Sequence, residues 1–186
     1  MISIAALWLP VLVSAVLVFF ASYAIHALLG YHANDFRKVP SEDAAMDAVR
    51  ALNLPPGDYH MPRPASAAAM RDPDFIAKLK RGPNVLMTVM PPYEGMGAKL
   101  GAWFAFCAIV GVFVAYLTSL ALPAGAPYMT VFRVSSAAAF MSYALGQWPR
   151  TIWHRKAWQT SLKETFDSLI YGLLTGGAFG WLWPAL

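Results

Sequence analysis

The hydrophobic positions of the chain fall into four long runs separated by polar stretches. The runs extend over residues 4–29, 100–122, 129–148 and 165–183. A helix rises about 1.5 Å per residue, so crossing a hydrocarbon core of about 30 Å takes roughly 20 apolar residues. Each run is about that long, and Pro123, Pro149 and Pro184 follow the last three. The pattern predicts an all-α membrane protein in which about four transmembrane helices form a bundle.

These runs divide the chain into three regions: a first transmembrane helix over 1–29, a connector over 30–99, and a three-helix transmembrane region over 100–186. Nine of the 14 prolines lie in the connector. Its pattern predicts short helices over 42–54, capped by Ser41, and over 73–81. A short strand over 85–90 is also expected, with 57–61 as a weaker candidate partner. With few large apolar side chains, a segment this small will hardly bury a core of its own. We therefore expect the connector to lie against the membrane or another protein.

The basic residues predict the orientation. Nine Lys and Arg side chains lie in the connector and four more between positions 150 and 163, whereas 123–128 has none. Lysine and arginine stay on the cytoplasmic side of a membrane. We therefore expect a multi-pass protein of the bacterial inner membrane, with both termini on the outer face and a cytoplasmic connector. The alternative is a cleaved signal peptide, which would place the connector outside. Such a peptide has a basic start and only about 7–15 apolar residues, whereas no Lys or Arg precedes Arg37.

The composition agrees with a membrane location. Hydrophobic residues make up 58% of the chain and charged residues 13%, with a formal net charge of +4. Soluble domains carry about a quarter charged residues. A basic and aromatic segment adjoins the third run, and we expect it to contact anionic lipid head groups rather than nucleic acid. Its lipid-contacting residues are Arg150, Trp153, Arg155, Lys156 and Trp158.

Small residues recur every three or four positions in three of the runs. In the second run they are Ala108, Gly111, Ala115 and Ser119. In the fourth run they are Ser168, Gly172, Gly176 and Gly180. In the third run they are Ser135, Ala139, Ser142 and Gly146. Small residues let helices approach closely in lipid, where no hydrophobic force drives their association. We expect these faces to meet inside one bundle; the alternative is that the glycine face of the fourth run binds a partner membrane protein.

Three ionisable residues within the runs are candidate functional groups: His26, Arg133 and Asp167. A polar side chain at membrane depth is a functional candidate by default. For His26 the alternatives are a hydrogen bond to a neighbouring helix, a side chain that points toward the interface, a proton relay, or a haem ligand together with His154. We expect no metal and no resident cofactor, and we interpret His32 and His60 as ordinary connector residues.

Arg133 and Asp167 have simpler interpretations as well. Arg133 is expected to reach the outer interface, where the C-terminal carboxylate of the chain or an anionic lipid would pair with it. Asp167 is expected in the first turn of the fourth helix, stabilised by the helix dipole and by Lys163 four residues before it. A coupling-proton site is the alternative for Asp167.

No catalytic signature is present, and the single Cys107 is interpreted as a small buried apolar residue. The segments 54–59, 82–85, 88–91 and 180–184 (LPPGDY, GPNV, TVMP and GWLWP) resemble those of small uncharacterised bacterial inner-membrane proteins with about four spans. That resemblance implies no chemistry and no site residues. The sequence thus predicts a non-enzymatic accessory, scaffold or assembly subunit of a membrane complex. Alternatives are a small oligomeric transporter or channel subunit and, third, a haem-binding electron-transfer protein.

Overall fold

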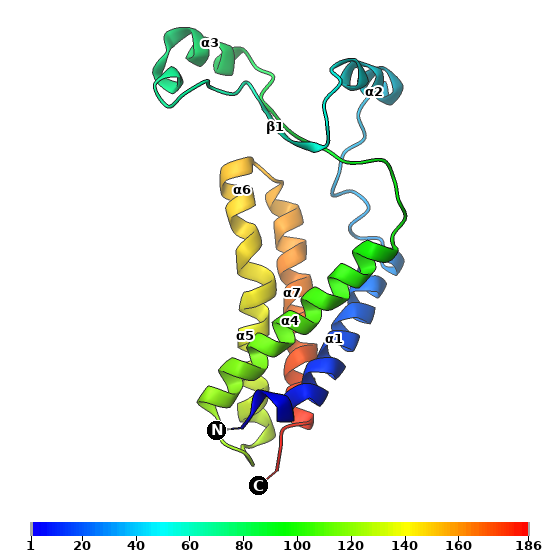
Figure 1. Cartoon of the computed structure of the whole chain (residues 1–186), viewed down its shortest axis with the longest axis vertical. Coiled ribbons are helices and arrows are strands. Elements are labelled where there is room, and N and C mark those ends of the chain that lie inside the picture. The colour runs from blue at the N-terminus through cyan, green and yellow to red at the C-terminus, as the bar shows by residue number, and fades with distance from the viewer. Residues whose placement is uncertain (1, 186) are drawn as a thin grey trace. The chain divides into compact units, whose positions relative to one another are not determined.

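The computed structural model describes residues 2–185 of the chain, which is mostly helical. The chain divides into two compact units (Figure 1). One comprises Met1–Phe36 and Gly95–Leu186, and the other comprises Arg37–Glu94. The first unit holds the long helices, and the second holds the short elements of the connector.

Two helices of the first unit are long and apolar enough to cross a membrane. One is the continuous stretch Ile4–Leu28, made of a 3-10 turn (Ile4–Leu7), α1 (Trp8–Tyr23) and a π-helical turn (Ala24–Leu28). The other is α4 (Gly97–Ala121), which ends just before Pro123. Both coincide closely with the first two apolar runs, and they support a membrane location.

The other two runs become helices with different bounds. α5 (Tyr128–Ala144) continues through a 3-10 turn (Leu145–Gln147) into α6 (Trp148–His154), so the helical stretch does not stop at Pro149. Proline is tolerated there because the first turn of a helix needs no donor from it. α7 (Trp158–Trp181) begins seven residues before the predicted start of the fourth run. Asp167 therefore lies well inside α7, and its predicted place in the first helical turn was wrong.

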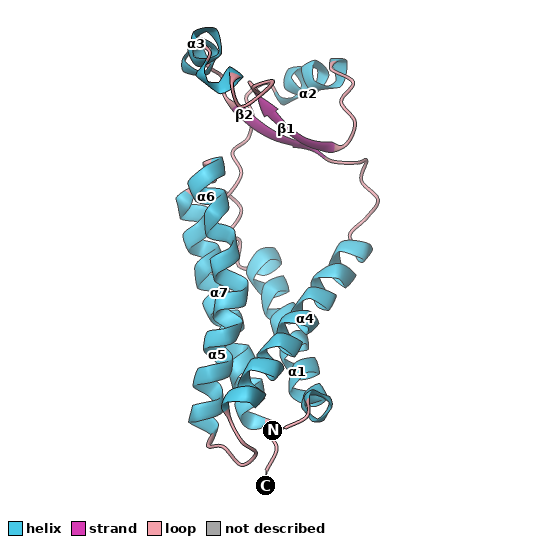
Figure 2. Cartoon of the chain, turned by 60° about the vertical axis from the view of Figure 1, so that its left-hand side comes forward, coloured by secondary structure: helices cyan, strands magenta, loops and turns pink. Residues whose placement is uncertain are grey.

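The long helices pack in antiparallel pairs (Figures 1 and 2). α5 and α7 lie closest together: an added Cβ atom on Gly172 would meet Phe140, and one on Gly180 would meet Tyr128. α1 and α4 pair in the same manner, with Gly111 against Val11. The small side chains of these contacts let the backbones approach, as expected for helices that associate in lipid.

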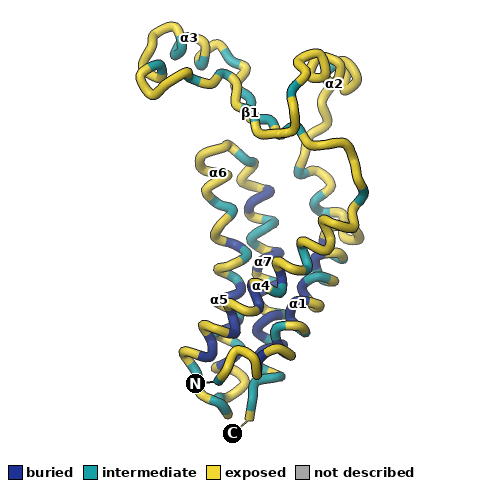
Figure 3. The backbone as a smooth tube through the Cα atoms, viewed as in Figure 1, coloured by how far each residue is buried: buried dark blue, intermediate teal, exposed yellow. Residues whose placement is uncertain are grey.

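The burial pattern of the first unit is unusual for a soluble protein (Figure 3). Large apolar side chains such as Phe20, Phe113 and Phe166 point outward and are 63%, 60% and 58% exposed. Small polar side chains are buried between the helices instead. They include Ser14, Ser22, Thr118, Ser119, Ser135, Ser168 and Thr175.

The second unit contains α2 (Glu42–Ala51), a 3-10 turn (Ala69–Arg71), α3 (Pro73–Arg81) and two strands. β1 (Gly57–Met61) and β2 (Val85–Val89) pair antiparallel, with Gly57 opposite Val89. The predicted strand pairing and the helix over 73–81 are thereby confirmed, so the chain is not purely α-helical. Ser41 was wrongly predicted as a cap, because its backbone is left-handed and its side chain caps nothing.

Candidate functional site

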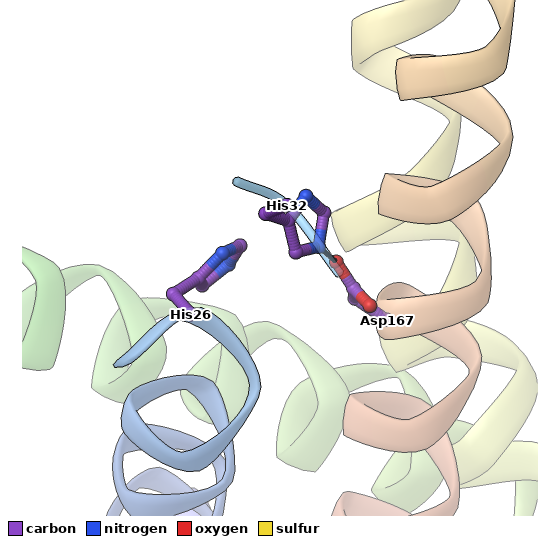
Figure 4. Close-up of side chains that lie close together, drawn as sticks. All are labelled: His26, His32 and Asp167. Atoms are coloured by element: carbon purple, nitrogen blue, oxygen red, sulfur yellow. Dashed lines mark hydrogen bonds and ion pairs between the residues drawn. The ribbon is translucent and has the colours of Figure 1, made fainter. Parts of the chain in front are cut away.

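The most polar buried region of the first unit lies where the chain leaves α1 and meets α7. The α1 helix ends in the π-helical turn Ala24–Leu28, which carries His26. The turn that follows holds Tyr31, His32 and Asp35, and the facing side of α7 supplies Lys163 and Asp167. We call these six residues the α1–α7 polar cluster. Figure 4 shows three of them, with His32 between His26 and Asp167.

Hydrogen bonds connect the two sides of the cluster. The Tyr31 hydroxyl donates to Oδ1 of Asp167, and Nε2 of His32 lies 2.8 Å from its Oδ2. The other ring nitrogen of His32, Nδ1, lies 2.6 Å from Oδ2 of Asp35. Lys163 donates to Oδ1 of Asp35 at 2.7 Å and to the Tyr31 carbonyl at 2.7 Å. The cluster thereby fixes the turn after α1 onto α7.

Burial makes these pairings necessary. The side chains of Asp167 and Asp35 are only 3% and 8% exposed, and an isolated buried carboxylate is very unfavourable. Burial by itself raises the pKa of Asp35. The hydrogen bonds from Lys163 and His32 outweigh that effect and hold the pKa of this carboxyl below its ordinary value. Burial, together with the hydrogen bond to Asp167, raises the pKa of Tyr31, so its phenol stays protonated as a donor.

His26 differs from the other members because its side chain is exposed. Its ring centre lies 4.4 Å from that of His32, with the planes tilted by 45°. Among the described residues, no hydrogen bond involves its ring. Ligand atoms of His26, His32 and Asp167 all lie within 4.8 Å of one another. Two imidazoles and a carboxylate at this separation are groups that can hold a metal ion.

The structure thus brings together two of the three candidate polar residues, His26 and Asp167, and leaves Arg133 apart. Arg133 occupies an exposed position on α5, and no ion pair within residues 2–185 involves it. Its predicted pairing with the C-terminal carboxylate concerns Leu186, which lies outside the described residues. The predicted pair of Lys163 with Asp167 was wrong, since Lys163 binds Asp35 instead.

The two residues considered as haem ligands lie in different elements. His26 groups with His32 and Asp167, whereas His154 is the exposed last residue of α6. The interpretation of His32 as an ordinary connector residue was wrong. His32 lies at the centre of the cluster and binds two carboxylates, those of Asp35 and Asp167.

The glycine face of α7 lies against α5 of the same chain. A Cβ atom added to Gly176 would come within 3 Å of Phe132 and Ser136, so a side chain there would require α5 to shift. The row of α5 that meets this face contains Tyr128, Phe132, Ser136 and Phe140. This row differs from the predicted small-residue stripe. In that stripe Ser135 and Ala139 are buried, but Ser142 and Gly146 are exposed.

The segment expected to contact lipid head groups is largely exposed. Trp153 and Trp158 are 79% and 61% exposed, and Arg150 and Arg155 are exposed as well. Lys156 is the exception, because its ammonium group lies 2.6 Å from Oε2 of Glu164. The pair links the segment before α7 to the second turn of that helix.

Comparison with protein-family models, curated proteins and solved structures finds no match to this chain. The interpretation of the site therefore depends on its own geometry. The signal for the members that sequence reasoning missed was present in the Tyr31-His32-x-x-Asp35 spacing directly after an apolar run. Pairing that turn with Lys163 and Asp167, more than 120 positions later, required knowing which helices are neighbours.

Proposed function

We propose that the chain is a four-span protein of the bacterial inner membrane. In this arrangement α1, α4, α5 and α7 form one bundle, both termini face outward, and residues 37–94 are cytoplasmic. Four features support it: the length and apolar character of α1 and α4, the antiparallel pairing of the helices, the outward-facing large apolar side chains, and the basic connectors. Buried small polar residues with apolar outer faces suit helices that pack together in lipid.

The proposal extends to α5 and α7 because of their surfaces. The outer face of α7 carries Phe166, Leu169 and Leu173, which are 43–58% exposed. In water these side chains would form an unfavourable apolar strip, whereas lipid solvates them. The helical stretch from Tyr128 to His154 is also long enough for a span, although no single regular helix covers all of it.

Within the membrane, we propose that the protein works by contact, as an accessory or assembly subunit of a larger complex. One observation carries this: no described residue of the unit Arg37–Glu94 is buried. A folded unit without a core of its own gains its stability from something it lies against. The unit nevertheless has regular helices and a paired hairpin, which suits a surface that a partner completes.

A groove in this unit is the part that a partner would occupy. It has a volume of about 870 Å³ and is formed by α2 and the end of β2. Its lining includes Met46, Val49, Val89 and Met90, with Met46 54% and Met90 72% exposed. Methionine-rich apolar surfaces adapt to the shape of a partner. The proposed occupant is an apolar segment of another protein of the complex, and the membrane surface is the competing occupant.

The transporter alternative receives less support from the geometry. It would use His26, Arg133 and Asp167 as its polar groups, but Arg133 is not linked to the cluster by any hydrogen bond or ion pair among residues 2–185. The haem alternative needs His154, the exposed last residue of α6, whereas His26 already groups with His32 and Asp167. The contact proposal requires neither combination.

The test is purification of the full chain from native membranes in a mild detergent, followed by determination of particle mass and composition. The groove variants Met46→Lys and Met90→Lys are compared with Met70→Lys, a similarly exposed position of the same unit outside the groove. We expect a stoichiometric partner to co-purify with the natural chain and with Met70→Lys but not with the groove variants. A chain that purifies alone, or a partner retained equally by all three variants, contradicts the proposal.

A further inference from the structure

The α1–α7 polar cluster contains a feature that the contact proposal does not use: three potential metal ligands that the fold brings together. His26 lies on the π-helical turn and His32 in the turn directly after it, whereas Asp167 on α7 is more than 130 positions away in sequence (Figure 4). Their ligand atoms all lie within 4.8 Å of one another. π-Helical turns occur frequently at functional sites, and here the turn carries the one exposed ligand.

Two of these ligands already have the outer partners that metal ligands need. Nδ1 of His32 is held by Asp35 at 2.6 Å, which leaves Nε2 directed toward Asp167. In metalloproteins a ligating histidine typically bonds a carboxylate through its second nitrogen, which sets its tautomer and orientation. Tyr31 occupies Oδ1 of Asp167 in the same way, leaving Oδ2 on the side of His32. Lys163 in turn holds Asp35 at 2.7 Å.

The separations are close to those of a bound ion. Zinc bonds to nitrogen and oxygen ligands are about 2.0–2.2 Å long, so two ligands of a tetrahedral ion lie about 3.4 Å apart. Nε2 of His32 and Oδ2 of Asp167 are 2.8 Å apart and need to separate only slightly. The remaining separations, up to 4.8 Å, require an inward movement of at most about 1.4 Å. His26 can make that movement because its side chain is exposed and no hydrogen bond among the described residues holds it.

A metal-free network is the competing interpretation. The two carboxylates, Lys163 and His32 are all linked by hydrogen bonds. That network explains every member except His26. A histidine ring 4.4 Å from the ring of His32, with no bond of its own in the described residues, adds nothing to an ion-pair network. It does supply the third ligand of a metal site.

We propose that His26, His32 and Asp167 bind a divalent transition-metal ion of the zinc class, with Asp35 and Tyr31 as orienting partners. Two imidazoles and one carboxylate leave a further coordination position for water or for a group from a partner. The bound ion would link the end of α1 to the middle of α7. The metal site is independent of the contact proposal, since the groove variants do not touch it.

The test uses the full chain in detergent, purified through a histidine-free tag and stripped with a chelator. Zn²⁺ is titrated by calorimetry, and Co²⁺ by the visible absorption that a tetrahedral site produces. We expect one ion per chain, with His26→Ala weakening binding at least tenfold. His26 is exposed and unbonded, so this variant keeps its fold and remains informative even where the buried Asp167→Asn fails to fold. Loss of the orienting partner in Asp35→Asn is expected to weaken binding by about 10–100-fold.

His60→Ala and His154→Ala are the matched controls, because both histidines are exposed and lie outside the cluster. Both are expected to bind zinc as the natural chain does. The proposal is overturned if the stripped natural chain takes up no stoichiometric Zn²⁺. It is equally overturned if His26→Ala binds as tightly as the natural chain, or if the control variants lose binding to the same degree.

Discussion

Replacing Gly176 with alanine tests the packing of α5 against α7 at its tightest point. A Cβ atom there would overlap Oγ of Ser136 and would lie 2.8 Å from the Phe132 carbonyl oxygen and 2.9 Å from Cβ of Ser136. The serine hydroxyl can rotate away, but the other two atoms are part of α5 or attached directly to it. Non-bonded carbon contacts are most favourable at about 3.5–4.0 Å, so α5 must move outward by roughly 0.6 Å or more.

That displacement sets the expected magnitude. Overpacking a close-packed contact typically costs about 1–3 kcal/mol, and we expect Gly176→Ala to lower the free energy of unfolding by that amount. The neighbouring Gly177 provides the control, since the nearest atom to an added Cβ is the Tyr128 hydroxyl at 4.0 Å. Alanine is favoured over glycine inside a helix by roughly 0.5–1 kcal/mol. Gly177→Ala should therefore be neutral or slightly stabilising.

The assay is reversible unfolding of the purified protein from a mild detergent into sodium dodecyl sulfate, followed by the loss of helical circular dichroism. The double variant Gly176→Ala/Ser136→Ala removes the closest contact but leaves the Phe132 carbonyl in place. It should recover only part of the lost stability. Equal stability of Gly176→Ala and Gly177→Ala would refute the close approach of the two helices.

Two further predictions concern single side chains. Lys163→Met should destabilise the protein by about 1–3 kcal/mol in the same unfolding assay, because Asp35, whose side chain is 8% exposed, loses its cationic partner. Lys156→Met should lower the free energy of unfolding by only about 0–1 kcal/mol, because the side chains of Lys156 and Glu164 are 28–30% exposed. An equal loss of stability in Lys163→Met and Lys156→Met would contradict the argument that the buried ion pair matters more. Cys107 is 1% exposed and should resist maleimide labelling until the protein is unfolded; rapid labelling in mild detergent would contradict its buried position between the helices.

Periodicity and length were sufficient to predict most elements of the fold. The first two apolar runs, the helix over 73–81 and the strand pair were all predicted from residue pattern, which reflects local physics. The ends of the third and fourth helices were predicted less well. Helical structure continues through Pro149, and α7 begins at Trp158 in a polar segment. Neither extension produces an apolar signal, so hydrophobicity alone could not reveal it.

The candidate site was predicted only in part, for a different reason. His26 and Asp167 were recognisable as polar residues in apolar surroundings, whereas His32 and Asp35 follow the run and resemble ordinary loop residues. Their role depends on contact with α7, more than 120 positions away in sequence. The contact face of α5 was predicted incorrectly for the same reason. The spacing of small residues along α5 was visible in the sequence, but the row of residues that meets the glycines of α7 depends on how α5 is rotated about its axis.

Cysteine labelling from each side of the membrane tests the four-span arrangement most directly. In a Cys107→Ala background, single cysteines are placed at three exposed alanines, Ala67, Ala157 and Ala185, and exposed to an impermeant maleimide in intact spheroplasts and in inverted vesicles. We predict that Ala185→Cys reacts in spheroplasts, whereas Ala67→Cys and Ala157→Cys react only in inverted vesicles. Labelling of Ala157→Cys from the outside would reduce the protein to two spans, α1 and α4. Labelling of Ala67→Cys from the outside would contradict the cytoplasmic placement of the connector.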